Sequence, residues 1–557
     1  MNSVGRICCL MLLASSFATF AYATTYNTPL QHVIILIQEN RTPDNLFYGD
    51  QTLVDRGGDV RPPGNQGACT KHGGNQPVAF VPWQLDACFS PGHGHGSWKK
   101  MYNLGDMDGA CKIIVNYDPN SGCDDSHLTP QCPQPDGGGP CPHYTFVDNP
   151  TILNPYFVIA NNYGFGNRFF QTNQGPSFPA HQFLLAGTSA PVAFSGNDPI
   201  NYYKWFVAEN PGPPNTDAGS RTGCTAPSDV YARTIDTGSA EAQSCPSIHN
   251  AYCPATCYDH NTLVDVLKTG SSVTWKYYGV GGHDMGQGSI WTAPNAIVNL
   301  CRKRTPNSVC NDPDWANVVF PGPNDNDDKA PILTAIENCT LSERVSWVVP
   351  DGKWSDHPGR VGHDGGPSWV AAIVNAIGNS YANSNHACDY WGGNGLASEE
   401  PTAILIVWDD WGGFYDHVAP FRSDQGGGYI NGEGTNYVYG FRVPFLVVSR
   451  YAQQYISNLN HDFGSILNFV EYVFGQGEHP LRTISEQYLY ADGLVQDTDL
   501  QHTYSLWDFF DFGAPRSFST IPGAKYPASC FHHPGNPGCF PSAADADPDD
   551  DAINDQD

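Results

Sequence analysis

Side chains that could bind a cation follow closely after two short apolar runs of this 557-residue chain. They are Glu39 and Asn40 after residues 33–37, and Asp409 and Asp410 after residues 404–408. Carboxylates that lie close together repel one another unless a cation lies between them. Oxygen ligands of this kind suit a hard or borderline divalent ion. An acidic residue at such a junction can also cap a helix, so the pattern alone leaves metal binding and helix capping both open.

The elements that must position these side chains are predicted to be short buried strands. Four nearly continuous runs are rich in Val, Ile and Leu, at residues 33–37, 345–349, 404–408 and 443–448. Such runs are typical of strands buried on both faces of a parallel sheet. Helical patterns at residues 369–377 and 465–473 then predict an α/β sandwich. In an open parallel sheet the functional site lies beyond the carboxyl ends of the strands, so we expect His357, which follows the second run, to join the acidic residues.

The first 23 residues have the pattern of an export signal. Arg6 is their one charged residue, an apolar run covers residues 7–20, and Ala-Tyr-Ala ends at Ala23. The run is shorter than the ~20 residues that a bilayer span needs. We therefore expect a secreted or periplasmic protein with no integral membrane segment in the mature chain.

Cysteine usage agrees with export. The chain has 18 cysteines, of which Cys8 and Cys9 lie in the signal region. The even number that remains predicts disulfides formed in an oxidising compartment. The close spacings of Cys253 with Cys257 and of Cys301 with Cys310 indicate local bridges within loops, while the full connectivity stays open.

The charge balance argues against a nucleic-acid partner. The formal net charge is −29, with 27 Lys and Arg residues against 56 Asp and Glu residues. A surface this acidic repels nucleic acid at long range. It also leaves few cationic side chains to hold an anionic substrate, and a bound metal ion would fill that role.

Five segments in order along the chain resemble the motifs of bacterial phospholipases C and acid phosphatases. They are HVIILIQENRTPDNLFYG (32–49), GPSFPAHQFLLAGT (175–188), WSDHPG (354–359), VWDDWGGFYDHVAP (407–420) and FRVPFLVVS (441–449). Each motif is weak alone, but five in family order between about residues 31 and 475 form a specific signal. The resemblance implies an alkaline-phosphatase-like α/β/α sandwich with a mostly parallel central sheet and long disulfide-tied loops.

Composition and pattern predict a division of the chain, and the resemblance implies a ligand set. The division has a signal peptide (1–23), a phosphoesterase catalytic domain (24–485) with a Cys-, Gly- and Pro-rich insertion (60–142), a C-terminal extension packing on the core (486–542) and an acidic disordered tail (543–557). One divalent metal ion would be held by Glu39, Asn40, Ser177, Asp409 and Asp410. Calcium, manganese, zinc and iron all remain open.

Catalytic roles follow from the same resemblance. Ser177 would attack phosphorus and carry a phosphoseryl intermediate, because metal coordination can activate a hydroxyl. His357 would be the general acid for the leaving group, since histidine titrates near neutral pH. His93 would bind phosphate, with His95 as the alternative in the same Gly-rich segment. His417 is expected to hold the loop after the double aspartate, with Asp416 orienting it.

Departures from the family pattern leave the substrate open. The segment after Ser177 reads Pro-Ala-His where family phospholipases usually have Pro-Asn-Arg, so an arginine contact is lost. The double aspartate resembles the acid phosphatase branch, which favours hydrolysis of phosphate monoesters. The alternative is a phospholipase C that cuts the phosphodiester of a phospholipid headgroup. A third hypothesis, a non-catalytic surface or binding protein, is disfavoured because every expected site residue is present.

Overall fold

The computed structural model describes residues 28–540, apart from the gaps given next. The gaps are 71–75, 117–130, 133–138, 141, 192–204, 213–221, 228–229, 237–254, 270–272, 281–288, 303–308, 325–326, 423–436, 476–480 and 482–503. The expected signal peptide (1–23) and acidic tail (543–557) lie outside the described residues.

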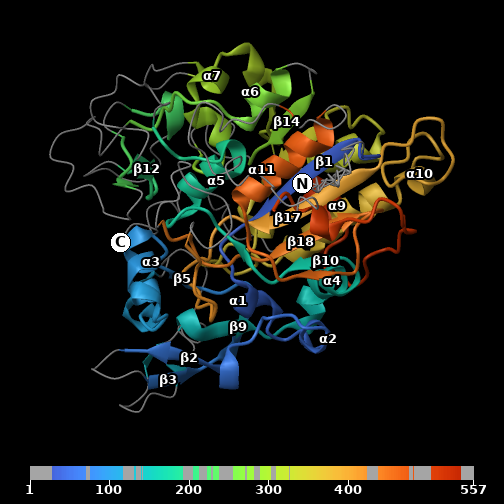
Figure 1. Cartoon of the computed structure of the whole chain (residues 1–557). Helices are drawn as coiled ribbons and strands as arrows, with labels where there is room; N and C mark the ends of the chain where they lie inside the picture. Colours follow the sequence, from blue (N-terminus) through green and yellow to red (C-terminus); the bar gives the residue numbers. More distant parts are fainter. Residues whose placement is uncertain are drawn as a thin grey trace, which may run out of the picture.

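An eight-stranded sheet forms the centre of the protein, and it confirms the α/β class (Figure 1). Its strands in spatial order are β15 (Val318–Val319), β14 (Trp275–Tyr278), β16 (Val345–Val348), β1 (His32–Gln38), β17 (Thr402–Trp408), β18 (Phe445–Ser449), β10 (Gly164–Gly166) and β19 (Ile456–Ser457). Neighbouring strands from β15 to β17 are parallel. Strand β18 is antiparallel to both β17 and β10, which corrects the expectation of a parallel strand for that run.

Helices cover both faces of this sheet. The longer of these helices are α4 (Pro150–Asn162), α5 (Ser177–Ala186), α9 (Gly366–Gly378) and α11 (Phe463–Phe474), whereas α3 (His95–Tyr102) packs in a separate cluster. The register places Trp347 of β16 and Trp408 of β17 on opposite faces, because successive side chains of a strand alternate. The Trp347 indole donates to the Leu184 carbonyl of α5, whereas Trp408 meets the ring of Tyr156 of α4 edge to face. Helices α5 and α4 therefore lie on opposite faces, as in a three-layer sandwich.

Smaller elements surround these layers. The remaining α-helices are α1 (Pro43–Phe47), α2 (Gln51–Asp55), α6 (Leu263–Lys268), α7 (Val298–Cys301), α8 (Pro331–Glu337), α10 (Ser380–Asn383) and α12 (Ser529–His532). Two-stranded sheets are formed by β2 (Gln66–Cys69) with β3 (Gln76–Ala79), β4 (Val81–Trp83) with β9 (Thr145–Val147), β5 (Ser90–Pro91) with β6 (Val115–Asn116), β7 (Gln131–Cys132) with β8 (Gly139–Pro140), β11 (Phe169–Phe170) with β20 (His461–Asp462), and β12 (Trp205–Val207) with β13 (Thr234–Asp236).

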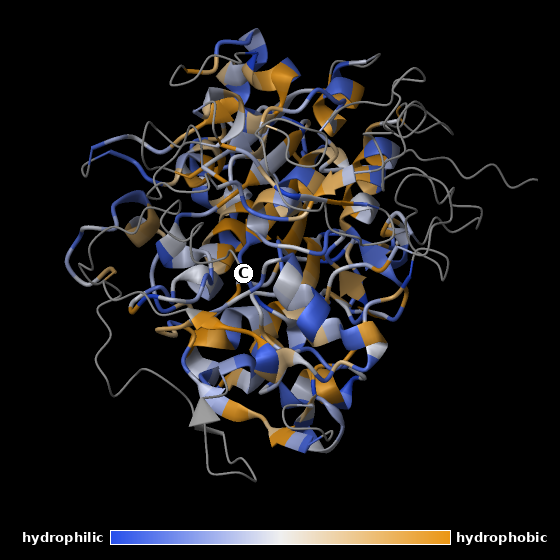
Figure 2. Ribbon diagram, turned by 90° about the vertical axis from the view of Figure 1, so that its left-hand side faces the viewer, coloured by the Kyte–Doolittle hydropathy of each residue, from blue (hydrophilic) through white to orange (hydrophobic). Residues whose placement is uncertain are grey.

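The apolar core lies between the sheet and its helices. All seven residues of β1 and of β17 are buried, and hydrophobic colours are concentrated in the central elements of Figure 2. Residues 504–540, part of the expected C-terminal extension, add to this core through Phe531 and Phe540. Their ring centroids lie 5.4 and 5.2 Å from that of Trp354. Among the described residues, no helix combines the length and apolar character that crossing a bilayer requires.

Disulfide bonds fasten several loops to one another. The described pairs are Cys69–Cys111, Cys224–Cys257, Cys301–Cys310, Cys339–Cys388 and Cys530–Cys539. The expected Cys301–Cys310 bridge is confirmed. The expected pairing of Cys257 with Cys253 is wrong, because Cys257 bonds Cys224, which is 33 residues away along the chain. Close spacing alone thus failed to identify a bridge between two separate loops.

A charge network, buried except for partly exposed His417 and Asp59, joins the loop that follows β17 to α1. The His417 ring lies 2.8 Å from an Asp44 oxygen through Nδ1 and 3.0 Å from Asp59 through Nε2. The expectation that Asp416 orients His417 is not what the contacts show, because both Asp416 oxygens accept from the Arg442 guanidinium. Burial opposes a charge on His417, but the bonds to Asp44 and Asp59 outweigh it and raise the pKa of His417 to about 10.

The network predicts how stability depends on pH. The folded pKa of His417 is raised, so its stabilising effect is complete below the unfolded value of ~6.5 and is lost as the pH rises through 10. We expect the free energy of unfolding to fall between pH 6.5 and pH 10 by about 3 kcal/mol more in the wild type than in His417→Gln. Urea unfolding of both proteins at pH 6, 8 and 10 measures this. Parallel pH profiles for the two proteins would contradict it.

Candidate active site

Ser177 is the first residue of α5, and three oxygen atoms from two strand ends surround its hydroxyl. Ser177 Oγ lies 3.2 Å from Asp410 Oδ2, 3.4 Å from Glu39 Oε2 and 3.4 Å from Asn40 Oδ1. All four residues are fully buried. A hydroxyl has one proton to donate, so it can satisfy one of these oxygens at a time. The structure therefore brings together four of the residues predicted from the sequence.

Asp409 ties the two strand ends to each other. Its Oδ1 accepts from the backbone N–H of Asn40 at 3.1 Å and from that of Asp410 at 2.7 Å. Asn40 has a φ of 59°, a left-handed conformation that asparagine tolerates better than most residues. A Cβ on Gly412 would lie 2.2 Å from the Asn40 carbonyl oxygen, so this close approach requires glycine. The glycine of the double-aspartate motif thus has a steric role at the site.

Arg41 and Thr42 hold the turn that follows Asn40. The Arg41 guanidinium donates to the carbonyls of Asp356 at 2.8 Å and Leu85 at 2.7 Å. Burial lowers the pKa of Arg41 to about 10, which still leaves it charged at neutral pH. The Thr42 hydroxyl accepts from the N–H of Asn45 and caps α1. Arg41 and Thr42 therefore fix the backbone of the turn that carries Glu39 and Asn40.

The two candidate histidines of the Gly-rich segment have different surroundings. The Asn40 amide nitrogen lies 3.1 Å from His93 Nε2, and His93 Nδ1 lies 2.9 Å from the Pro91 carbonyl. Nδ1 must carry the proton to bond a carbonyl, so Nε2 is left to accept from the amide. The ring of His95 instead stacks on Trp98, 5.7 Å between centroids. It is His93, rather than His95, that contacts the residues around Ser177.

His357 lies next to His93, with 6.5 Å between the ring centroids. Its Nδ1 lies 2.7 Å from the Pro358 carbonyl. The preceding residue, Asp356, is buried, and its Oδ2 accepts from Tyr156 at 2.7 Å and from Trp408 at 3.1 Å. Asp356 therefore anchors the loop on the layer of α4, and the loop holds His357 beside the site.

His181 is the residue that the sequence prediction missed. It lies one turn after Ser177 on the same side of α5, where residues four apart are neighbours. Its Nε2 lies 3.1 Å from Glu39 Oε1 and 3.8 Å from Asp409 Oδ2. Burial lowers the pKa of His181 to about 4, so the ring is neutral at pH 7. The i, i+4 spacing from Ser177 was the signal available in the sequence.

The electrostatics of this cluster fit a bound cation. Burial raises the pKa of Glu39 well above its usual range, and the negative charges of Asp409 and Asp410 raise it further. Asp409 Oδ2 is buried and has no hydrogen-bond partner in the described part of the chain. Single ligand atoms of Glu39, His181 and Asp409 lie within 4.8 Å of one another. A divalent ion would neutralise this buried negative charge and give the unpartnered oxygen a ligand role.

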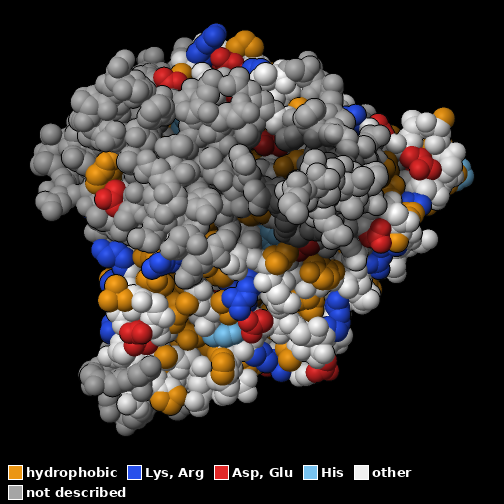
Figure 3. Space-filling model, viewed as in Figure 1, with side chains coloured by type: hydrophobic (Ala, Val, Ile, Leu, Met, Phe, Trp, Pro, Cys, Tyr) orange, Lys and Arg blue, Asp and Glu red, His pale blue; other side chains and the backbone are white. Residues whose placement is uncertain are grey.

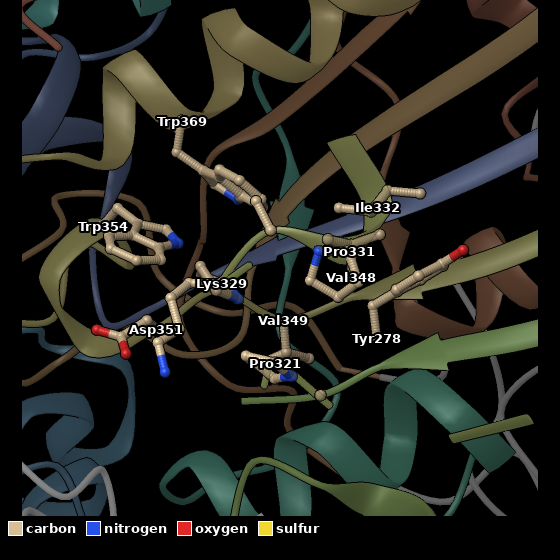
Figure 4. Close-up of a pocket in the computed structure, with 13 residues that line it drawn as sticks. Tyr278, Pro321, Lys329, Pro331, Ile332, Val348, Val349, Asp351, Trp354 and Trp369 are labelled. Atoms are coloured by element: carbon tan, nitrogen blue, oxygen red, sulfur yellow. The ribbon is translucent and has the colours of Figure 1, made fainter. Parts of the chain in front are cut away.

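Figure 4 shows a different pocket, which Tyr278, Val349 and Trp369 help to line. None of the predicted catalytic or metal-binding residues borders it. The described part of the face in Figure 3 shows Lys and Arg side chains scattered singly, without one dominant basic patch. We therefore take the cluster around Ser177 as the candidate active site.

Comparisons with known proteins agree with this geometry. A stretch of 153 residues is 28% identical to the non-hemolytic phospholipase C of Pseudomonas aeruginosa and covers 24% of this chain and 20% of that protein. A stretch of 198 residues is 26% identical to phospholipase C A of Mycobacterium tuberculosis and covers 33% of this chain and 32% of that protein. The matches thus span about a third or less of each relative's length.

A family model matches much more of the chain than these relatives do. The model is that of the Phosphoesterase family, and it covers residues 30–476. That range contains all five sequence motifs and every residue of the cluster around Ser177. The chain belongs to the Phosphoesterase family.

Proposed function

We propose that this protein hydrolyses phosphate esters and that Ser177 is its nucleophile. One observation carries the proposal: the Ser177 hydroxyl lies within 3.4 Å of oxygens from Glu39, Asn40 and Asp410. Membership of the Phosphoesterase family and the names of the matched relatives support the same class of reaction.

The reaction begins at the N-terminus of α5. Ser177 Oγ attacks phosphorus in line with the leaving oxygen and forms a phosphoseryl intermediate, which water then hydrolyses. The partial positive charge of a helix N-terminus favours the added negative charge of that intermediate. Burial of Ser177 and its neighbours limits competing water around the attacking oxygen.

His357 protonates the leaving alkoxide in this proposal. Its Nδ1 lies against the Pro358 carbonyl, so Nδ1 donates to that carbonyl and Nε2 is the nitrogen that can pass a proton to the leaving group. His93, next to it, contacts Asn40 and contributes to binding of the phosphoryl group. His93 orients Asn40 as well, because the Asn40 amide donates to it.

A single divalent metal ion is part of the proposal. Its protein ligands are Glu39, Asn40, Ser177, Asp409 and Asp410. Such an ion would lower the pKa of the serine hydroxyl and place positive charge beside the phosphoryl oxygens. The raised pKa of Glu39 and the unpartnered Asp409 oxygen support this ligand set.

A phospholipase C activity is the second candidate. The relatives from Pseudomonas aeruginosa and Mycobacterium tuberculosis bear that name, and the substrate would be the phosphodiester of a phospholipid headgroup. The double aspartate, Asp409 and Asp410, resembles that of the acid phosphatase branch and favours the monoesterase. Export from the cell, to the periplasm or the medium, is proposed for either activity and is supported by the five described disulfides.

Replacing the nucleophile tests the proposal. We expect Ser177→Ala to lower kcat by about 1,000-fold or more, because the substitution removes the oxygen that forms the proposed intermediate. A slow phosphate ester with a radiolabelled phosphoryl group should label the wild type and leave this variant unlabelled. Ser189→Ala is the matched control, since that buried hydroxyl donates to the Val207 carbonyl and should leave labelling intact. Undiminished turnover in Ser177→Ala would remove Ser177 from the role.

Paired initial rates distinguish the two substrates. We expect p-nitrophenyl phosphate to be hydrolysed with a kcat/KM at least about tenfold above that of p-nitrophenyl phosphorylcholine, because Asp409 and Asp410 resemble the double aspartate of the acid phosphatase branch. The assay covers acid to neutral pH with divalent ions supplied. A preference of the same size for the choline diester would instead assign the phospholipase C activity.

A further inference from the structure

The His181 ring faces the carboxylates of Glu39 and Asp409. Its Nε2 lies 3.1 Å from Glu39 Oε1 and 3.8 Å from Asp409 Oδ2, and all three side chains are fully buried. Glu39 presents its other oxygen, Oε2, to Ser177. The Glu39 carboxylate therefore lies between the hydroxyl of Ser177 and the ring of His181, which are one helical turn apart on α5.

A single N–H on the His181 ring cannot give a hydrogen bond to both carboxylates. A neutral ring has one N–H, and a hydrogen on Nε2 at 3.1 Å from Glu39 leaves Asp409 Oδ2 without a hydrogen-bond partner in the described part of the chain. An unpaired buried carboxylate oxygen is costly. A cation between the three side chains would contact both carboxylates and the nitrogen lone pair at once, and their ligand atoms lie within 4.8 Å of one another.

We propose that His181 is a nitrogen ligand of the metal ion, on the side of the site formed by Glu39 and Asp409; this inference rests on the proposed function. The ligand set then contains one imidazole besides its oxygens. An imidazole suits iron and zinc, whereas calcium takes oxygen ligands. His181 therefore sets the preference of the site for a transition metal over calcium.

The competing interpretation is that His181 donates to Glu39 and positions it. The two roles differ in one measurable property, a bond between the metal and a histidine nitrogen. His93 Nε2 is a second imidazole nitrogen close to the cluster, 3.9 Å from Asp410 Oδ2. It accepts from the Asn40 amide, so we expect it to stay outside the set of metal ligands.

Electron spin echo spectroscopy of the full chain loaded with one equivalent of Mn²⁺ tests the proposal. We expect modulation from a directly bonded nitrogen in the wild type, a changed frequency after labelling histidine with ¹⁵N, and loss of the signal in His181→Gln. His93→Gln is the matched variant and should keep the signal. The labelled wild type needs no substitution, so it tests for a histidine ligand even where His181→Gln folds poorly.

Metal competition gives a second readout. His181→Gln should lower the affinity for Zn²⁺ by about tenfold or more and change that for Ca²⁺ by less than about threefold, because glutamine offers an oxygen in place of nitrogen. Bound Mn²⁺ without nitrogen modulation, or a signal that survives in His181→Gln, would overturn the role of His181 alone. Failure of the wild type to bind Mn²⁺, Zn²⁺ or Ca²⁺ would overturn the proposed metal site as well.

Discussion

Mutual repulsion among three buried carboxylates is the constraint on which the site depends. Glu39, Asp409 and Asp410 lie at adjacent strand ends with no exposed surface. Burial and the negative charges of the neighbouring aspartates raise the pKa of Glu39. The guanidinium of nearby Arg41 donates to the backbone carbonyls of Asp356 and Leu85 rather than to these carboxylates. In the proposed mechanism, a divalent ion would neutralise this repulsion and activate the Ser177 hydroxyl, which lies beside Glu39, Asp410 and the Asn40 amide.

The fold supplies that arrangement through the order of its strands. Parallel strands β1 and β17 are neighbours, so their carboxyl ends deliver the Glu-Asn and Asp-Asp pairs to one place. Helix α5 covers one face of the sheet and brings Ser177 and His181 to the same edge. The loop after β16 adds His357, and the Gly-rich loop adds His93. Segments far apart in the sequence thus meet because parallel strands end on one side.

Much of this site was predictable because its residues follow buried strands directly. Glu39, Asn40, Asp409 and Asp410 needed only the strand pattern and the motif order. The role of His181 was not predictable in this way, because the side of α5 that faces Glu39 depends on how the helix packs on the sheet. The antiparallel direction of β18 and the Cys224–Cys257 bridge depend on contacts between distant segments, which local spacing does not encode.

Elemental analysis of the purified protein tests most directly whether the carboxylate cluster holds an ion. We predict close to one divalent ion per chain after gel filtration and a large loss of that ion in Asp409→Asn. Asp389→Asn is the matched control, since this buried aspartate accepts from the Gly392 N–H in a turn after α10, and it should retain the ion. Full phosphate-ester turnover by protein that contains no metal would contradict the account.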